Sequence, residues 1–147
     1  MYISNATGCS SIWGGPAATS PYTTNAEGHG PAWANSLFED NAEHGYGMFL
    51  GQTAIRERLI DDAKAISESD KASAEVKAAA DKYLETLNDA KSNAEASKAL
   101  TAAIKASGAD CDKCKDILEN SEYLSKKSVW IFGGDGWAYD IGFGGVD

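Results

Sequence analysis

The sequence predicts an α/β fold, and three observations support this class. Residues 129–132 (VWIF) form a short, apolar, β-prone run that is typical of a buried strand. Residues 2–5 form a second strand candidate near the start of the chain. Between these runs, residues 54–107 are rich in Ala, Lys, Glu and Ser and show helical periodicity. We therefore expect a strand, a loop, a helix, a helical segment, a second strand, a glycine-rich turn and the start of a further helix.

The first strand candidate is followed by a long stretch of loop. Residues 7–11 (TGCSS) are small and polar, and for Cys9 taken alone a buried, inert thiol is the commonest interpretation. Residues 13–31 are rich in Gly, Pro, Thr and Ser, which predicts a long ordered loop of the kind that often carries function. For His29 in this loop, local hydrogen bonding is favoured over acid or base chemistry, so we assign it no chemical role.

A helix is expected after this loop. Asn35 or Ser36 is a suitable N-cap for a helix that begins near Leu37. Three acidic residues in its first turns suit the positive end of a helix dipole better than they suit a metal site. They are Glu39, Asp40 and Glu43.

The helical segment carries thin, Ala-rich apolar stripes at helical spacing, which predict two or three amphipathic helices. Residues 92–95 (SNAE) match the capping-box pattern, and Gly108 suits the end of a helix. We interpret these helices as packing elements inserted between the two sheet segments, with a partner-binding arm as the alternative. The stripes are Ile55, Leu59, Ala63 and Ile66; Val76, Ala80, Tyr83, Leu84 and Leu87; and Ala96, Leu100 and Ile104.

Cys111 and Cys114 form a C-x-x-C pair, a spacing that recurs in zinc, redox and cluster sites. The pair has no second C-x-x-C and no nearby histidine, so we expect two free thiols at a helix start. Together with Cys9 they leave open a further possibility, a small metal-binding protein.

The charge distribution limits the possible ligands and partners. The net charge of −9 argues against nucleic acid or an anionic membrane as partner. No apolar run approaches membrane-spanning length and no signal-peptide pattern is present, so a soluble, cytoplasmic protein is expected. All 13 Lys and Arg residues lie between Arg56 and Lys127. A phosphate bound outside that range must therefore rely on backbone N–H groups, a helix N-terminus and a metal ion, which disfavours a Walker-type loop with its lysine.

The glycine-rich turn after the second strand candidate is the best candidate site. Gly133, Gly134 and Gly136 surround Asp135 directly after the strand, where open α/β sheets place their ligands. The glycines allow a ligand to approach the backbone closely, and Asp135 offers a hard oxygen to a divalent cation. The alternative is a tight turn that only ends a core strand.

Three strings of the sequence resemble one enzyme family. Residues 134–136 (GDG) resemble the opening of the thiamine-diphosphate motif. Residues 5–15 (NATGCSSIWGG), 30–48 (GPAWANSLFEDNAEHGYGM) and 129–145 (VWIFGGDGWAYDIGFGG) are similar, in the same order, to pyruvate:ferredoxin (or flavodoxin) oxidoreductases. Three ordered matches are far more specific than the GDG triplet alone.

The resemblance implies part of a doubly wound thiamine-diphosphate-binding domain with a helical insertion. Residues 1–53 would be the first part of that domain, residues 54–127 the insertion, and residues 128–147 the strand with a truncated magnesium and diphosphate motif. The chain would thus be a fragment, or one piece of a split subunit.

The resemblance also implies the site residues, none of which is a catalytic side chain. Asp135 would bind Mg²⁺, and backbone N–H groups near Gly134, Gly136 and Trp137 would approach the diphosphate. Cys9 would be one thiolate ligand of a 4Fe-4S cluster and face the cofactor ring, with Ser10 beside it.

The intact enzyme would then oxidatively decarboxylate pyruvate to acetyl-CoA and pass electrons through iron–sulfur clusters to ferredoxin or flavodoxin. Its partners would be pyruvate, coenzyme A, the electron acceptor and the remaining domains of the same enzyme. The fragment alone is expected to be inactive. The alternative is a non-catalytic, acidic helical interaction module.

Overall fold

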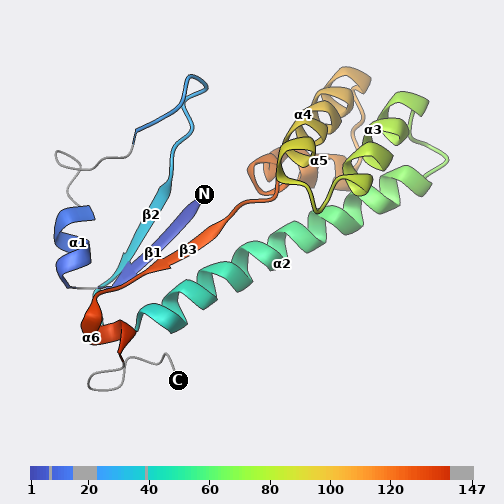
Figure 1. The fold of residues 1–147 in the computed structure, drawn as a ribbon. Helices are drawn as coiled ribbons and strands as arrows, with labels where there is room; N and C mark the ends of the chain where they lie inside the picture. The colour runs from blue at the N-terminus through green and yellow to red at the C-terminus, as the bar shows by residue number, and fades with distance from the viewer. Residues whose placement is uncertain (7, 15–22, 39, 140–147) are drawn as a thin grey trace. The chain divides into compact units, whose positions relative to one another are not determined.

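The structure is a computed structural model that describes residues 1–6, 8–14, 23–38 and 40–139 (Figure 1). The chain divides into two compact units. The first, here called the sheet unit, comprises Met1–Gly51 and Lys127–Asp147; the second, the helical unit, comprises Gln52–Lys126. Strands and helices are both present and the strands are parallel, so the predicted α/β class is confirmed.

The sheet unit contains a three-stranded parallel sheet with the order β2-β1-β3. The central strand β1 (Tyr2–Ala6) pairs with β2 (Ala32–Ser36) on one side and with β3 (Val129–Phe132) on the other. Tyr2 lies opposite Ala32 in one pairing and opposite Val129 in the other. Because all three strands run in the same direction, their carboxyl ends meet at one edge of the sheet.

Strand β2 is absent from the sequence prediction, which placed a loop and then a helix near this point. Its sequence, AWANS, is small and polar apart from Trp33 and lacks the apolar alternation of a strand. It forms because β1 provides a ladder of backbone partners along its whole length. As an outer strand it is partly exposed, so it needs few apolar side chains.

The prediction that β3 is buried is wrong. Trp130, Ile131 and Phe132 are 51%, 40% and 38% exposed. Of the four residues of β3, only Val129 is half-buried. The apolar run predicted burial on both faces, but β3 is an outer strand of a small sheet. Within the described residues, too few elements cover it to remove its side chains from water.

Helix α2 (Asn41–Glu68) begins four residues later than the predicted start near Leu37. The Ser36 hydroxyl accepts a hydrogen bond from Phe38 N–H at 3.2 Å and donates one to the Asp40 carboxylate. These bonds hold a turn ahead of the helix, as serine often does when it competes for backbone groups. The first helical bond then runs from His44 N–H to the Asp40 carbonyl at 2.9 Å.

The glycines in the first turns of α2 differ in what surrounds them. A Cβ added at Gly45 would lie 2.6 Å from Ile131 Cδ1 and 3.3 Å from Ser4 Cβ, so this glycine allows the helix to approach the sheet. A Cβ added at Gly47 would meet nothing within 4 Å.

We therefore expect Gly47→Ala to stabilise the protein by about 0.5–1 kcal/mol, because alanine costs less backbone entropy in a helix. Gly45→Ala should give less stabilisation or a loss, because Ile131 must move to admit the methyl group. Thermal denaturation of the two variants, followed by far-ultraviolet circular dichroism, tests the ranking. A larger gain for Gly45→Ala would contradict the described packing of α2 on the sheet.

The helical unit combines the later turns of α2 with four further elements around one apolar core. The core is built from the predicted stripes: Leu59, Ala63 and Ile66 of α2, Val76, Ala80 and Tyr83 of α3, and Ala96, Leu100 and Ile104 of α4 are all buried. These stripe predictions are confirmed. The elements are α3 (Ala74–Glu85), α4 (Ala90–Ser107), α5 (Asp112–Glu119) and the short 3₁₀ helix η1 (Ser121–Tyr123).

The ends of α4 show one correct and one wrong prediction. Gly108 ends the helix in the left-handed region, with φ 63°, as predicted. The predicted capping box at Ser92 is wrong, because the N-cap is Asp89, whose carboxylate accepts from Ser92 N–H at 2.7 Å. Aspartate is an equally good cap, and it starts the helix three residues earlier.

Two polar side chains tie the helical unit together from inside. The Tyr83 hydroxyl is buried and donates to the Leu124 carbonyl at 3.0 Å. The Arg56 guanidinium donates to that same carbonyl at 3.1 Å and to the Leu87 carbonyl at 3.0 Å. These bonds join α2, α3 and the segment after η1.

Tyr83→Phe is expected to destabilise the helical unit by about 1 kcal/mol, because one buried hydrogen bond is lost while Arg56 still satisfies the Leu124 carbonyl.

Burial raises the pKa of Tyr83, with Arg56 partly opposing the change. The folded state therefore holds the phenol proton more tightly than the unfolded state, so this stabilising effect is complete below the ordinary tyrosine pKa and declines as the pH rises above it. Urea denaturation at increasing alkaline pH should show a decline that Tyr83→Phe removes; parallel curves for the two proteins would contradict this account.

Cys111 and Cys114 are joined by a disulfide, so the prediction of two free thiols is wrong. Their expected place at a helix start is correct, because Cys111 is the N-cap of α5. In this cap geometry the Cα atoms lie 5.1 Å apart, within the range that a disulfide spans. Spacing alone cannot distinguish the two redox states.

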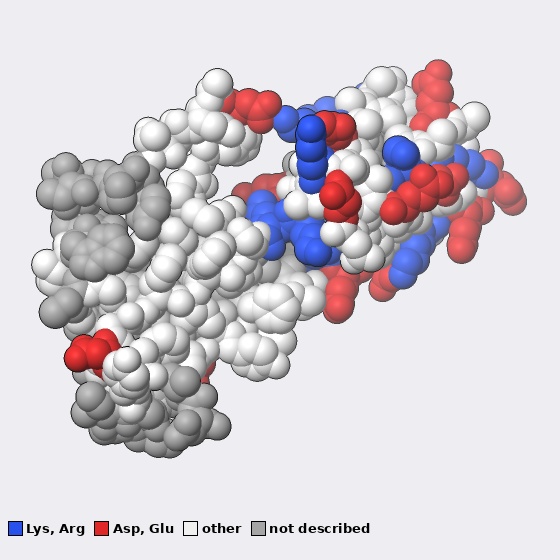
Figure 2. Space-filling model, viewed as in Figure 1, with Lys and Arg blue, Asp and Glu red and all other residues white. Residues whose placement is uncertain are grey.

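Among the described residues, no helix is both long enough and apolar enough to cross a membrane. The charged side chains gather on the helical unit, where Lys and Arg atoms alternate with Asp and Glu atoms on the face shown in Figure 2. The sheet unit is nearly free of positive charge, since only Lys127 lies within it.

Candidate functional site at the carboxyl edge of the sheet

The candidate site lies where the chain leaves β1 and β3. Gly8 follows β1 and leads into α1 (Cys9–Gly14), and Gly133 follows β3 and leads into α6 (Asp135–Ala138). β1 and β3 are neighbours, so the two turns that carry the predicted site residues lie at adjacent strand ends. The strand order also reverses beside β1, and ligands of open α/β sheets bind at such a reversal.

The GGDG turn carries the Asp135 carboxylate and the backbone N–H donors at the start of α6. Asp135 is exposed, and within the described residues its carboxylate has no hydrogen bond or ion pair. The first helical bonds run from Ala138 N–H to the Gly134 carbonyl and from Tyr139 N–H to the Asp135 carbonyl. The N–H groups of Asp135, Gly136 and Trp137 thus precede the first helical bond and donate to no group among the described residues.

Gly133 is required by a close contact. A Cβ at this position would lie 2.1 Å from Cε3 of Trp137, so the indole ring rests directly on the glycine backbone. A Cβ at Gly134 or Gly136 would meet nothing within 4 Å among the described residues. The Trp137 indole nitrogen is buried without a hydrogen-bond partner among the described residues.

The turn after β1 is held from inside. Gly8 has φ 152°, a conformation that favours glycine, and Cys9 opens α1 directly after it. The Ser10 hydroxyl is buried and donates to Asn5 Oδ1 at 2.8 Å, so this side chain anchors the turn to β1. The side chain of Cys9 lies outside the described part of the structure.

A buried polar network fixes the β3 end relative to β1 and α2. The Asn41 side-chain N–H donates to the Phe132 carbonyl, the last residue of β3. A carbonyl only accepts, so the other end of this amide, Oδ1, faces Ser4 and must accept from the Ser4 hydroxyl at 3.1 Å. Ser4 has then used its only proton, and His44 Nδ1 at 2.9 Å must carry the hydrogen that it donates to Ser4.

A second, partly buried branch of hydrogen bonds reaches β2. Asn5 Nδ2 donates to Asn35 Oδ1 at 3.2 Å, and Asn35 Nδ2 donates to the Ser36 carbonyl at 2.7 Å. With Ser10 and Asn41, these side chains link all three strand ends. Sequence reasoning missed this network, although two polar residues inside a strand candidate, Ser4 and Asn5, were a usable signal, since buried polar groups need partners.

The described residues fit only part of a metal site. No group of three or more His, Cys, Asp or Glu side chains in the described structure is placed to hold a metal ion. The Asp40 carboxylate accepts a hydrogen bond from Ser36, and Glu39 lies outside the described residues. Asp135 can supply one hard oxygen ligand to a cation.

His29 lies away from this edge of the sheet. Its backbone carbonyl accepts from Asn25 N–H at 2.8 Å, and its N–H donates to Asn25 Oδ1 at 3.0 Å. The loop leads into the start of β2, whereas the candidate site lies beyond the strand ends. These bonds are made by the His29 backbone, and the interpretation of its imidazole ring stays a prediction.

No family model matches the chain. Along its full length, however, the chain is 53% identical to the pyruvate:ferredoxin oxidoreductase of Moorella thermoacetica and 49% identical to the pyruvate-flavodoxin oxidoreductase of Klebsiella pneumoniae. It is also 42% identical, over 99% of its length, to the mitochondrial pyruvate dehydrogenase [NADP(+)] of Euglena gracilis. The predicted resemblance is confirmed. The chain spans only 13%, 12% and 8% of these three relatives.

Proposed function

We propose that this chain is a segment of a pyruvate:ferredoxin or pyruvate:flavodoxin oxidoreductase and forms part of its thiamine-diphosphate and magnesium site. One observation carries the proposal: the GGDG turn and the turn that bears Cys9 lie at adjacent carboxyl ends of a parallel sheet, beside a reversal of strand order. The similarity along the full length of the chain supports it.

The chain's own residues would anchor the diphosphate end of the cofactor. The Asp135 carboxylate would bind the Mg²⁺ ion, and the N–H groups at the start of α6 would donate to the phosphate oxygens. Local Lys and Arg side chains are nearly absent from the sheet unit, so a metal ion is the main source of positive charge for a bound diphosphate. When bound, thiamine diphosphate supplies the carbanion stabilisation that decarboxylation of a 2-oxo acid requires.

Cys9 would ligate a 4Fe-4S cluster near that cofactor. The residue opens α1 at the strand end next to β3, which would bring an electron acceptor close to the site of decarboxylation. Ser10 would contribute by anchoring the turn through Asn5. The remaining cluster thiolates would come from outside this chain, because Cys111 and Cys114 already bond to each other.

The names of the relatives indicate which part of the reaction this segment serves. Pyruvate appears in all three names, whereas ferredoxin, flavodoxin and NADP(+) each appear in only one. A segment shared by all three fits the common oxidation of pyruvate better than the recognition of one acceptor. We infer that the intact protein uses coenzyme A, reduces the electron acceptor and lies in the cytoplasm. Residues 54–127 would be a helical insertion in it.

The proposal is tested by comparing the intact protein with the isolated chain. The intact protein should bind thiamine diphosphate in the presence of Mg²⁺ and reduce a viologen dye when pyruvate and coenzyme A are added. The purified 147-residue chain should do neither, because it offers one metal ligand and a sheet of three strands. An intact protein without pyruvate-dependent reduction, or an active isolated chain, would overturn the proposal.

A further inference from the structure

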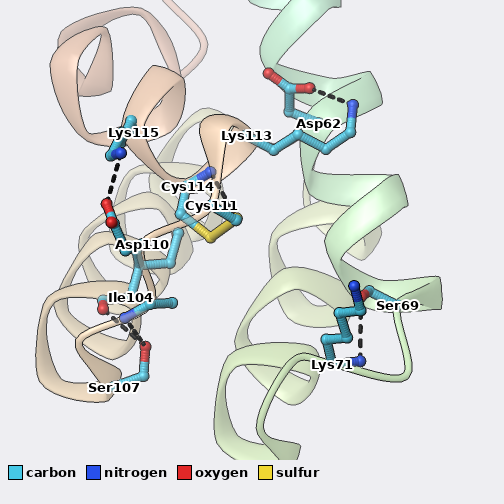
Figure 3. Close-up of a disulfide and its surroundings, with 11 residues drawn as sticks. Asp62, Ser69, Lys71, Ile104, Ser107, Asp110, Cys111, Lys113, Cys114 and Lys115 are labelled. Carbon is cyan, nitrogen blue, oxygen red and sulfur yellow. Dashed lines mark hydrogen bonds and ion pairs between the residues drawn. A yellow bond between two sulfur atoms is a disulfide. The ribbon is translucent and has the colours of Figure 1, made fainter.

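We propose that the Cys111–Cys114 disulfide is a thiol–disulfide exchange site at which an external dithiol attacks Cys111. This inference concerns the helical unit and does not depend on the proposed function of the sheet unit. It stands on the unequal exposure of the two sulfur-bearing residues, on the cap geometry of α5, and on the open space beside the bond (Figure 3).

The two cysteines differ sharply in exposure. Cys111 is exposed, whereas Cys114 is 3% exposed and belongs to the apolar core with Ile104 and Ile117. An external thiol therefore has access to Cys111 and little access to Cys114. A purely structural disulfide does not require this difference in exposure between its two cysteines.

The sulfur of Cys111 lies at the start of α5. This sulfur accepts the Cys114 N–H at 3.1 Å, and Cys111, as the N-cap, lies at the positive end of an eight-residue helix. A cysteine at an exposed helix start is a more reactive site for exchange than one in an apolar core. Lys113 and Lys115 are each paired with a carboxylate, Lys113 with Asp62 at 2.9 Å and Lys115 with Asp110 at 2.6 Å.

Space for an attacking group lies next to the disulfide. A hollow of about 540 Å³ is lined by both cysteines and by residues that include Ile66, Ala72 and Val76. The loop closed by the disulfide spans only four residues, and short loops gain the least from cross-linking. The core around Cys114 is formed by side chains from α2 to α5, so apolar packing holds this residue in addition to the bond.

The exchange takes place in two steps. A thiolate of the external dithiol bonds to Cys111 Sγ, the Cys111–Cys114 bond breaks, and the Cys114 sulfur leaves as a thiolate that takes up a proton. The second thiolate of the dithiol then attacks the dithiol sulfur of the mixed disulfide, forms the dithiol's internal disulfide, and releases Cys111 as a thiolate. The dithiol is oxidised to a disulfide, and the cysteine pair is reduced by two electrons.

The first test treats the full, oxidised chain with dithiothreitol in the absence of denaturant. The thiols are blocked with N-ethylmaleimide, and peptide mapping separates Cys111 and Cys114 from Cys9. We expect Cys111, the exposed cysteine, to be labelled while the far-ultraviolet circular dichroism of the helices is unchanged. Labelling only after the helices melt would identify a structural staple and overturn the proposal.

The second test asks which sulfur reacts. Cys114→Ala keeps an apolar side chain in the core and leaves Cys111 free, whereas Cys111→Ser leaves Cys114 free. With glutathione disulfide as probe, Cys111 should form a mixed disulfide at least about tenfold faster than Cys114. Equal rates, or a faster Cys114, would contradict the assignment of Cys111. If either variant fails to fold, the dithiothreitol test on the wild-type chain decides the proposal alone.

Discussion

In the intact protein, Asp135→Asn is expected to weaken the binding of thiamine diphosphate with Mg²⁺ by about a hundredfold or more. The carboxylate is exposed at the start of α6 and is bound to nothing else among the described residues. An amide of the same shape keeps the turn but removes the negative charge that a hard cation requires. The loss should therefore appear in cofactor affinity and leave the folding of the protein unchanged.

Titration calorimetry with thiamine diphosphate at fixed Mg²⁺ measures this effect. Asp70→Asn is a matched control, because Asp70 is also an exposed aspartate but lies in the helical unit. The control should bind as the parent does, and both variants should melt at the parent's temperature. If Asp135→Asn retained the parent's affinity, Asp135 would not be the metal ligand.

Cys9→Ser in the intact protein is expected to remove one 4Fe-4S cluster, or most of it, and with it the transfer of electrons from pyruvate. A serine hydroxyl is a poor substitute for a thiolate in cluster ligation. Cys9 opens α1 at the strand end next to β3, whereas Cys111 and Cys114 bond to each other within the helical unit. Iron analysis and the visible absorbance of the purified protein measure the loss.

The paired variant Cys111→Ser and Cys114→Ser serves as the control for cluster content. It removes two cysteines, yet it should keep the parent's iron and absorbance. Thiamine-diphosphate binding should survive in Cys9→Ser, because the anchoring groups lie in the other turn. Iron loss in the paired variant together with full iron in Cys9→Ser would reverse the assignment.

Sequence patterns predicted the helical unit well because its helices follow one simple rule. The apolar positions recur at helical spacing, and those at Leu59, Tyr83 and Leu100 are fully buried. The caps were harder to predict. Asp89 and Ser92 are both good capping residues, and only the folded backbone decides which of them accepts the first N–H.

The sheet unit was predicted less completely, because its order depends on pairing rather than on local pattern. Strand β2 has a weak strand sequence and forms against β1, a partner about thirty residues away in the chain. The sequence predicted the two candidate turns, the one that bears Cys9 and the GGDG turn, from local patterns of glycine and aspartate. The Asn41 bond to the Phe132 carbonyl joins residues 91 positions apart, and no local pattern indicates such a bond.

The exposed outer strand β3 has a consequence for handling the isolated chain. Its four residues are uncharged and β-prone, and the Trp130 and Phe132 rings stack with their centroids 6.1 Å apart on one face. Its outer edge has no strand partner among the described residues, and it carries neither the lysine nor the proline that commonly protects such edges. Copies of the separated chain are therefore expected to join through β3 into intermolecular sheets at high concentration, so that aggregation sets the limit on expressing this segment alone.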